Sequence, residues 1–242
     1  WHHNFGKIAI FWAILFIVPF SLNYNVSTAF YEFLHVMLLE YVPFIILLLS
    51  LYTVGGGICI KGNLVGTPKL NFIIILIGTI LSSWMGTTGA AMLLIRPLIR
   101  ANKWRNKKTH VVIFFIFLVA NIGGSLTPLG DPPLFLGFLQ GVSFFWTTRA
   151  LLVPMIIVAC YVLIIFYFLD LYFYNKEVDK KPDDGDFNLS IDGKINFLLL
   201  LGIVVGVLVS GFWNPHIEFN IYGVHLLLQN IARDVILLII TI

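Results

Sequence analysis

Asp131 is the residue whose position in this chain most demands a chemical explanation. It lies within residues 120–137, which are flanked by the apolar run 111–119 and by a second apolar run beyond residue 150. A charged side chain inside such an apolar region is costly and by default indicates a functional site. A carboxylate can hold a proton or a cation, and a site that holds either but not both can exchange one for the other.

The residues around Asp131 interrupt any helix that would contain it. The interrupting residues are Gly123, Gly124, Pro128, Gly130, Pro132 and Pro133. In lipid, irregular backbone is tolerated only where it is buried in protein or lines a cavity, and transporters hold ions at helices broken in this way. Pro132 and Pro133 suit the first turn of a new helix, so Asp131 could alternatively serve only as the N-cap of that helix.

The composition indicates a protein embedded in a membrane. Of the 242 residues, 59% are apolar and only 11% are charged, whereas a soluble domain carries about 25% charged residues. The two cysteines, Cys59 and Cys160, lie in or beside apolar runs and indicate neither a disulfide framework nor a metal site. Membrane lipid is therefore an expected partner, and nucleic acid is not.

Long apolar runs predict an all-α, multi-pass membrane fold, because a spanning helix needs about 20 residues. The runs are 8–22, 34–54, 70–99, 110–141, 150–174 and 195–213, and a last run is cut at residue 242. The polar connections are 23–33, 55–69, 100–109, 142–149, 175–194 and 214–232. We expect the run 110–141 to cross once as a broken helix, with its unwound part near the midplane.

Positive charge predicts that the run 70–99 does not cross the membrane. If every run crossed once, the basic connections 55–69 and 100–109 would lie on opposite sides, which the positive-inside rule disfavours. If 70–99 instead enters and leaves by the same face, 13 of the 15 Lys and Arg residues lie on one side. The tip of this re-entrant hairpin is expected at 84–90. Each arm then extends about 15–24 Å and reaches the midplane of a core about 30 Å thick.

Two irregular segments rich in small residues are thus expected to meet at mid-depth, the hairpin tip at 86–89 and the unwound segment at 121–133. Hard cations prefer oxygen ligands. Freed carbonyls and helix C-terminal ends suit cations, while helix N-termini attract anions. The residues expected to bind ion or substrate are Asp131, Asn121, Thr127, Ser125, Gly130, Thr87, Thr88, Gly86 and Gly89. A sodium ion is expected at Asp131, Asn121 and Thr127. The Gly-Thr-Thr-Gly tip could alternatively be a plain tight turn.

The pattern Asn-Ile-Gly-Gly-x-x-Thr-Pro-x-Gly-Asp-Pro-Pro at 121–133 resembles the unwound-helix signature of the ion transporter superfamily. More closely, the chain resembles the citrate transport or sodium:proton antiporter family, which is similar to NhaD-type antiporters. The resemblance rests on residues 53–58, 86–97, 110–115 and 121–138 and covers nearly the whole chain.

The resemblance implies two inverted repeats, each with a re-entrant hairpin and a broken helix. The chain then divides into a first repeat (1–174), a polar linker on the basic side (175–194) and the start of a second repeat (195–242). It also implies the inner membrane of a bacterium and admits a homodimer. Two departures concern the substrate: Leu134 stands where many relatives have Asn, and the hairpin tip lacks the Ser-Asn-Thr of the dicarboxylate transporters.

Taken together, these features predict a secondary transporter that exchanges sodium for protons at Asp131. The alternative within transport is cation-coupled uptake of citrate or another carboxylate, and an ion channel is a more remote one. We expect no enzyme activity and no cofactor, because the apolar runs contain no HExxH, Asp-x-Asp or Ser/His/Asp set.

Three charged features have simpler interpretations. Asp170 is expected to form an ion pair or to extend towards the basic face. The basic cluster at 100–108 is expected to face anionic lipid headgroups. Arg96 is expected to extend to the interface and not to bind substrate.

Overall fold

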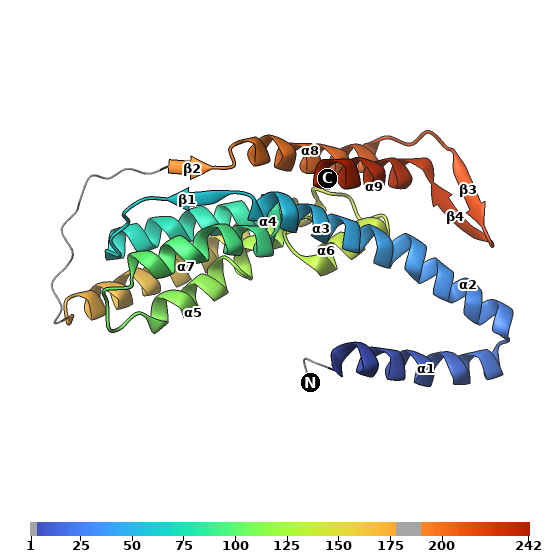
Figure 1. Cartoon of the computed structure of the whole chain (residues 1–242), viewed down its shortest axis with the longest axis horizontal. Coiled ribbons are helices and arrows are strands. Elements are labelled where there is room, and N and C mark those ends of the chain that lie inside the picture. The colour runs from blue at the N-terminus through green and yellow to red at the C-terminus, as the bar shows by residue number, and fades with distance from the viewer. Residues whose placement is uncertain (1–3, 178–189) are drawn as a thin grey trace.

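The computed structural model describes residues 4–177 and 190–242, and most of them are helical (Figure 1). The central part of the predicted linker, residues 178–189, lies outside the described residues. The α-helices are α1 (Phe5–Asn23), α2 (Val26–Val36), α3 (Val42–Gly56), α4 (Pro68–Ala101), α5 (Thr109–Leu118), α6 (Pro132–Leu139), α7 (Trp146–Tyr174), α8 (Ile195–Phe212) and α9 (Leu228–Thr241). Within this part of the chain, six helical stretches are long and apolar enough to cross a membrane. The multi-pass fold is therefore confirmed.

The second apolar run forms a longer helix than the sequence predicted. A π-helical segment, Met37–Tyr41, joins α2 to α3, so that one helix extends from Val26 to Gly56. The helix begins before the apolar run 34–54, and Asn25 caps it: its side-chain oxygen accepts a hydrogen bond from the Thr28 amide at 2.7 Å. Such a cap satisfies an otherwise unpaired amide at the start of a helix.

Helix α4 is a hairpin, although its length alone would allow a crossing. The amide of Gly66 donates to the carbonyl of Ala101 at 2.8 Å, so the two ends of the segment meet. Asn71 and Asn102 exchange amide hydrogen bonds of 3.0 and 2.7 Å beside this contact. The chain reverses at Gly86, whose φ of 78° is sterically accessible to glycine. The fold-back and its tip agree with the charge-based prediction.

The next apolar run is a broken helix, as predicted. Helix α5 ends at Leu118, a short 3₁₀ segment covers Ile122–Leu126, and α6 begins at Pro132. Irregular backbone therefore extends over residues 119–131, at the point where the glycines and prolines are concentrated.

The basic connections meet at one end of the helix bundle (Figure 1). Strand β1 (Cys59–Lys61) pairs antiparallel with β2 (Ser190–Asp192). Arg100 donates to the Ile60 carbonyl at 2.8 Å. The Glu177 carboxylate accepts from the amides of Asn106 and Lys107 at 3.1 and 2.9 Å. These contacts bring together the connections that the positive-inside argument assigned to one side.

Helices α8 and α9 lie side by side and pack on α3 (Figure 1). The hydroxyl of Ser50 on α3 donates to the carbonyl of Leu237 on α9 at 3.1 Å. The connection between α8 and α9 holds a β-hairpin of β3 (Glu218–Ile221) and β4 (Val224–Leu227) at the end of the bundle away from β1 and β2. This connection ends at residue 227, earlier than the predicted 232.

The fold predicts which exposed positions an impermeant thiol reagent reaches from each side. In a background without Cys59 and Cys160, Lys69→Cys and Lys103→Cys should both react from one face. Ser143→Cys, in the loop between α6 and α7, should react only from the other. Labelling of the two lysine positions from opposite faces would show that α4 crosses the membrane.

Candidate functional site

Hydroxyl groups bind the hairpin to the unwound segment. Ser82 donates to the carbonyl of Val119 at 2.6 Å. Ser83 donates to the carbonyl of Gly123, and its own carbonyl accepts from the Thr127 hydroxyl. These bonds satisfy carbonyls that lost their helical partners, which is a requirement for irregular backbone at membrane depth.

Helix α7 satisfies one more carbonyl of the break. The hydroxyls of Thr147 and Thr148 lie 3.0 and 2.6 Å from the carbonyl oxygen of Leu126, to which both donate. The 3₁₀ segment is therefore fastened on one side by the hairpin and on the other by the first turn of α7.

The hairpin tip contacts the unwound backbone directly. The amide of Thr87 donates to the carbonyl of Gly130 at 3.1 Å. A Cβ on Gly130 would lie 2.0 Å from the carbonyl oxygen of Gly124, and a Cβ on Gly124 would lie 2.5 Å from the Thr87 methyl group. Only glycine allows this approach, so Gly124 and Gly130 act through packing.

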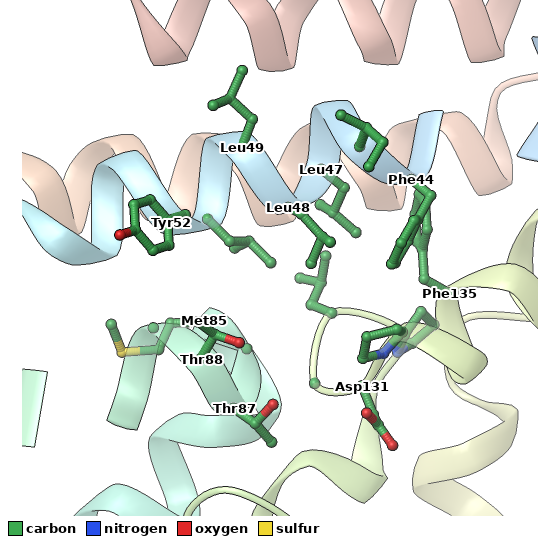
Figure 2. A pocket seen from close by; sticks show the side chains of 18 residues that line it. Phe44, Leu47, Leu48, Leu49, Tyr52, Met85, Thr87, Thr88, Asp131 and Phe135 are labelled. Atoms are coloured by element: carbon green, nitrogen blue, oxygen red, sulfur yellow. The ribbon is translucent and has the colours of Figure 1, made fainter. Parts of the chain in front are cut away.

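The tip and the unwound segment enclose a cavity of about 440 Å³ with α3. Figure 2 shows α3 with Leu47, Leu48 and Tyr52 on one side, and Thr87 and Asp131 on the other. From the predicted site it includes Gly86, Thr87, Thr88, Gly89, Pro128, Gly130, Asp131 and Pro132. The predicted meeting of the two irregular segments is thus present.

Several oxygen atoms of residues that line this cavity have no hydrogen-bond partner among the described residues. Asp131 is exposed and begins α6, but its side chain forms no capping hydrogen bond. Within the part of the chain that the structure describes, the hydroxyls of Thr87 and Thr88 and the carbonyls of Pro128 and Leu129 also form no hydrogen bond. A carboxylate, two hydroxyls and two carbonyls are the kinds of ligand that a hard cation prefers. The interpretation of Asp131 as a mere helix cap finds no support in these contacts.

Three predicted ligands do not line this cavity. The Thr127 hydroxyl is used in its bond to Ser83 and is buried. Ser125 donates to the Ile122 carbonyl at 2.9 Å, and the Asn121 amide donates to the Ile116 carbonyl at 3.0 Å. Their donor groups bond to nearby backbone, and neither Asn121 nor Thr127 lines the cavity that includes Asp131, so a sodium ion shared by these three residues stays a prediction. Gly123, Gly124 and Pro133 likewise shape the backbone outside the cavity lining.

Charge at the cavity has one sign among the described side chains. Of those that line it, Asp131 alone is ionisable apart from Tyr52. Arg96 lies outside the lining and is exposed, in agreement with its expected position. Among the described lining residues Asp131 thus carries the full negative charge, and most of the other lining side chains are apolar.

A second aspartate, Asp170, lies in a buried polar cluster at the open end of the hairpin. Its carboxylate is 2.7 Å from Arg105 Nη2 and 2.7 Å from His110 Nε2, and it accepts from the Asn71 amide at 2.9 Å. Arg105 also donates to Asn102 at 3.2 Å. The cluster joins both arms of the hairpin to α5 and α7.

The sequence indicated this cluster only in part. Asp170 was expected to form an ion pair or extend to the basic face, and it forms the pair. Arg105 was grouped with residues facing lipid headgroups, which is wrong, because the residue is only 1% exposed. The sequence signal that could have predicted the cluster was the presence of two polar residues, Asn71 and His110, near helix ends.

The chain matches, over residues 1–242, the family model described as "Putative citrate transport". No curated protein and no solved structure matches the chain. The match confirms the family resemblance drawn from residues 121–133 and the other motifs.

The two aspartates are expected to differ in their effect on stability. Asp170→Asn leaves the buried Arg105 guanidinium without its carboxylate, so it should lower the free energy of unfolding by about 3 kcal/mol. Asp131→Asn removes no hydrogen bond to the described residues and should change the free energy of unfolding by less than about 0.5 kcal/mol. Denaturation of both variants in detergent measures the difference, and equal losses would contradict these assignments.

Proposed function

The chain belongs to the family described as "Putative citrate transport", and from that premise we propose that it exchanges sodium for protons at Asp131. Among the described residues, six helical stretches are long and apolar enough to cross a membrane, although one of them, α4, folds back. With membership of a transport family, they make the chain an integral membrane protein of the transporter class. The identity of the coupled ions is our proposal. We also propose that the protein is located in the inner membrane of a bacterium, as the family resemblance implies.

The observation that carries the proposal is the set of oxygens, without hydrogen-bond partners among the described residues, that line the same cavity as Asp131. Thr87, Thr88, Pro128 and Leu129 offer neutral oxygens, and Asp131 supplies the single full charge. A sodium ion is neutralised by that carboxylate, and so is a proton. Since the carboxylate cannot bind both at once, binding of sodium releases the proton and binding of a proton releases the sodium ion. This competition couples the two fluxes in opposite directions.

The hydroxyl bonds indicate which parts would move together. Ser82, Ser83 and Thr127 join the first hairpin arm to the unwound segment at several points. We therefore expect the hairpin and the broken helix to travel as one body past α3, whose contribution to the cavity is mostly apolar side chains. Movement of one packed body around a site at mid-depth is the usual form of alternating access.

Cation-coupled citrate uptake is the second candidate, and the family description favours it. Helix α6 and the second hairpin arm both begin at the cavity, after Asp131 and after Gly86. A helix N-terminus carries about half a positive charge, which attracts a carboxylate. Against this, no Lys or Arg is found among the described residues that line the cavity.

Asp131→Asn in the full-length protein should abolish sodium-driven proton movement in proteoliposomes, because the neutral amide cannot exchange a proton for an ion. A pH-sensitive dye inside the vesicles reports the flux. Asp192→Asn, which alters an exposed carboxylate paired with Lys61, is the matched control and should retain the wild-type rate. Undiminished sodium-driven proton flux in Asp131→Asn would contradict the proposed mechanism.

Labelled citrate separates the two candidates in the same vesicles. Antiport predicts that a sodium gradient moves protons with no citrate present and that citrate does not accumulate. Citrate uptake that depends on the sodium gradient, with no proton movement in its absence, would replace the first candidate by the second.

A further inference from the structure

A second cavity, of about 270 Å³, lies where the ends of α6 and α8 meet the start of α9. This is the end of the bundle away from the basic connections (Figure 1). Polar side chains contribute to its lining, namely Ser143, Ser210, Gln229, Asn230 and Arg233. The proposed ion exchange uses none of them.

Arg233 is buried, and one of its guanidinium nitrogens has no hydrogen-bond partner among the described residues. The residue is 1% exposed, and its Nε donates to the Asp234 carboxylate at 2.8 Å. Its Nη1 is 3.4 Å from the Asn230 side-chain oxygen, while Nη2 has no hydrogen-bond partner among the described residues. A buried guanidinium N–H is seldom left unpaired, because the missing bond costs free energy.

Gln229 is the second incompletely bonded group at the same cavity. It is 7% exposed, and its Oε1 has no partner within the described part of the chain. Helix α9 also begins here without a side-chain cap and without an acidic residue in its first turn. The region thus combines an unpaired cationic donor, an unpaired acceptor and the positive end of a helix.

We propose that this cavity binds a small carboxylate anion, with the carboxylate on Arg233. Guanidinium groups pair well with carboxylates because their N–H groups match the carboxylate oxygens. A hydroxyl on the same molecule would donate to Gln229 Oε1, so a hydroxycarboxylate satisfies both groups at once. Asp234 opposes binding, since its carboxylate already neutralises part of the Arg233 charge.

The site is separate from the Asp131 cavity but adjacent to it. Arg233 Cζ lies 5.5 Å from the centre of the Phe135 ring, and Phe135 also lines the Asp131 cavity. A carboxylate held at Arg233 would thus be one aromatic ring away from the ion site. The inference does not require ion exchange at Asp131, because Arg233 Nη2 and Gln229 Oε1 have no hydrogen-bond partner among the described residues, whichever ion is carried.

Calorimetric titration of citrate into the full-length protein in nanodiscs tests the site. Citrate should bind, and Arg233→Gln should weaken binding by about tenfold or more, the usual effect of losing a hydrogen bond to a charged group. Arg149→Gln removes an exposed arginine that does not line the cavity and should leave the affinity unchanged. Asp234→Asn should tighten binding by removing the competing carboxylate.

Tricarballylate, which has the three carboxylates of citrate but no hydroxyl, tests the role of Gln229. The wild type should bind tricarballylate more weakly than citrate. Gln229→Met should bind the two molecules with equal affinity. Since Arg233→Gln could misfold, its elution in size-exclusion chromatography and its thermal unfolding are compared with the wild type. Arg233→Lys, which keeps the charge, should bind with intermediate affinity.

The location is tested by alkylation. Citrate should slow alkylation of the thiol in Ser143→Cys, which lines this cavity, and Arg233→Gln should remove the protection. Equal citrate affinity in the wild type and a folded Arg233→Gln, or no binding by a folded wild type, would overturn the inference. Loss of binding in Asp131→Asn alone would assign citrate to the other cavity and likewise overturn it.

Discussion

The structure depends on how backbone groups are satisfied where the helix between α5 and α6 is unwound. A bilayer supplies no water to the carbonyls of Val119, Gly123, Leu126 and Gly130. Hydroxyls of Ser82, Ser83, Thr147 and Thr148 and the Thr87 amide take the place of the missing helical donors. The hairpin must therefore lie against the broken helix, and this contact determines where its tip is.

What remains unsatisfied after this pairing becomes the candidate ion site. The donor groups of Thr127, Ser125 and Asn121 bond to backbone carbonyls at the break. The hydroxyls of Thr87 and Thr88 and the Asp131 carboxylate have no hydrogen-bond partner among the described residues. The two aspartates show the contrast. Asp170 is enclosed by Arg105, His110 and Asn71 and holds the open end of the hairpin together. Asp131 has no such partners among the described residues, so its charge remains available for a ligand.

Much of the architecture could be predicted because its causes are visible in the sequence. The distribution of lysines and arginines predicted that 70–99 folds back, and Gly86 predicted the position of its tip. The hydrogen-bond partners of side chains were harder to predict from the sequence, because a helix that is apolar all round gives no periodic signal of which face is buried. Arg105 therefore looked like one basic residue among several. Thr127 was recognised as an oxygen donor, but the carbonyl of Ser83 that it meets comes from a segment 44 positions away.

The central claim is that a cation and a proton compete for Asp131 beside the hairpin tip. The most direct measurement is the alkylation rate of the thiol in Thr88→Cys, in a background without Cys59 and Cys160, as a function of sodium concentration and pH. The account predicts that sodium slows alkylation, that the sodium concentration needed rises as the pH falls, and that Asp131→Asn removes the effect. Protection by sodium that is the same at every pH and survives Asp131→Asn would contradict it.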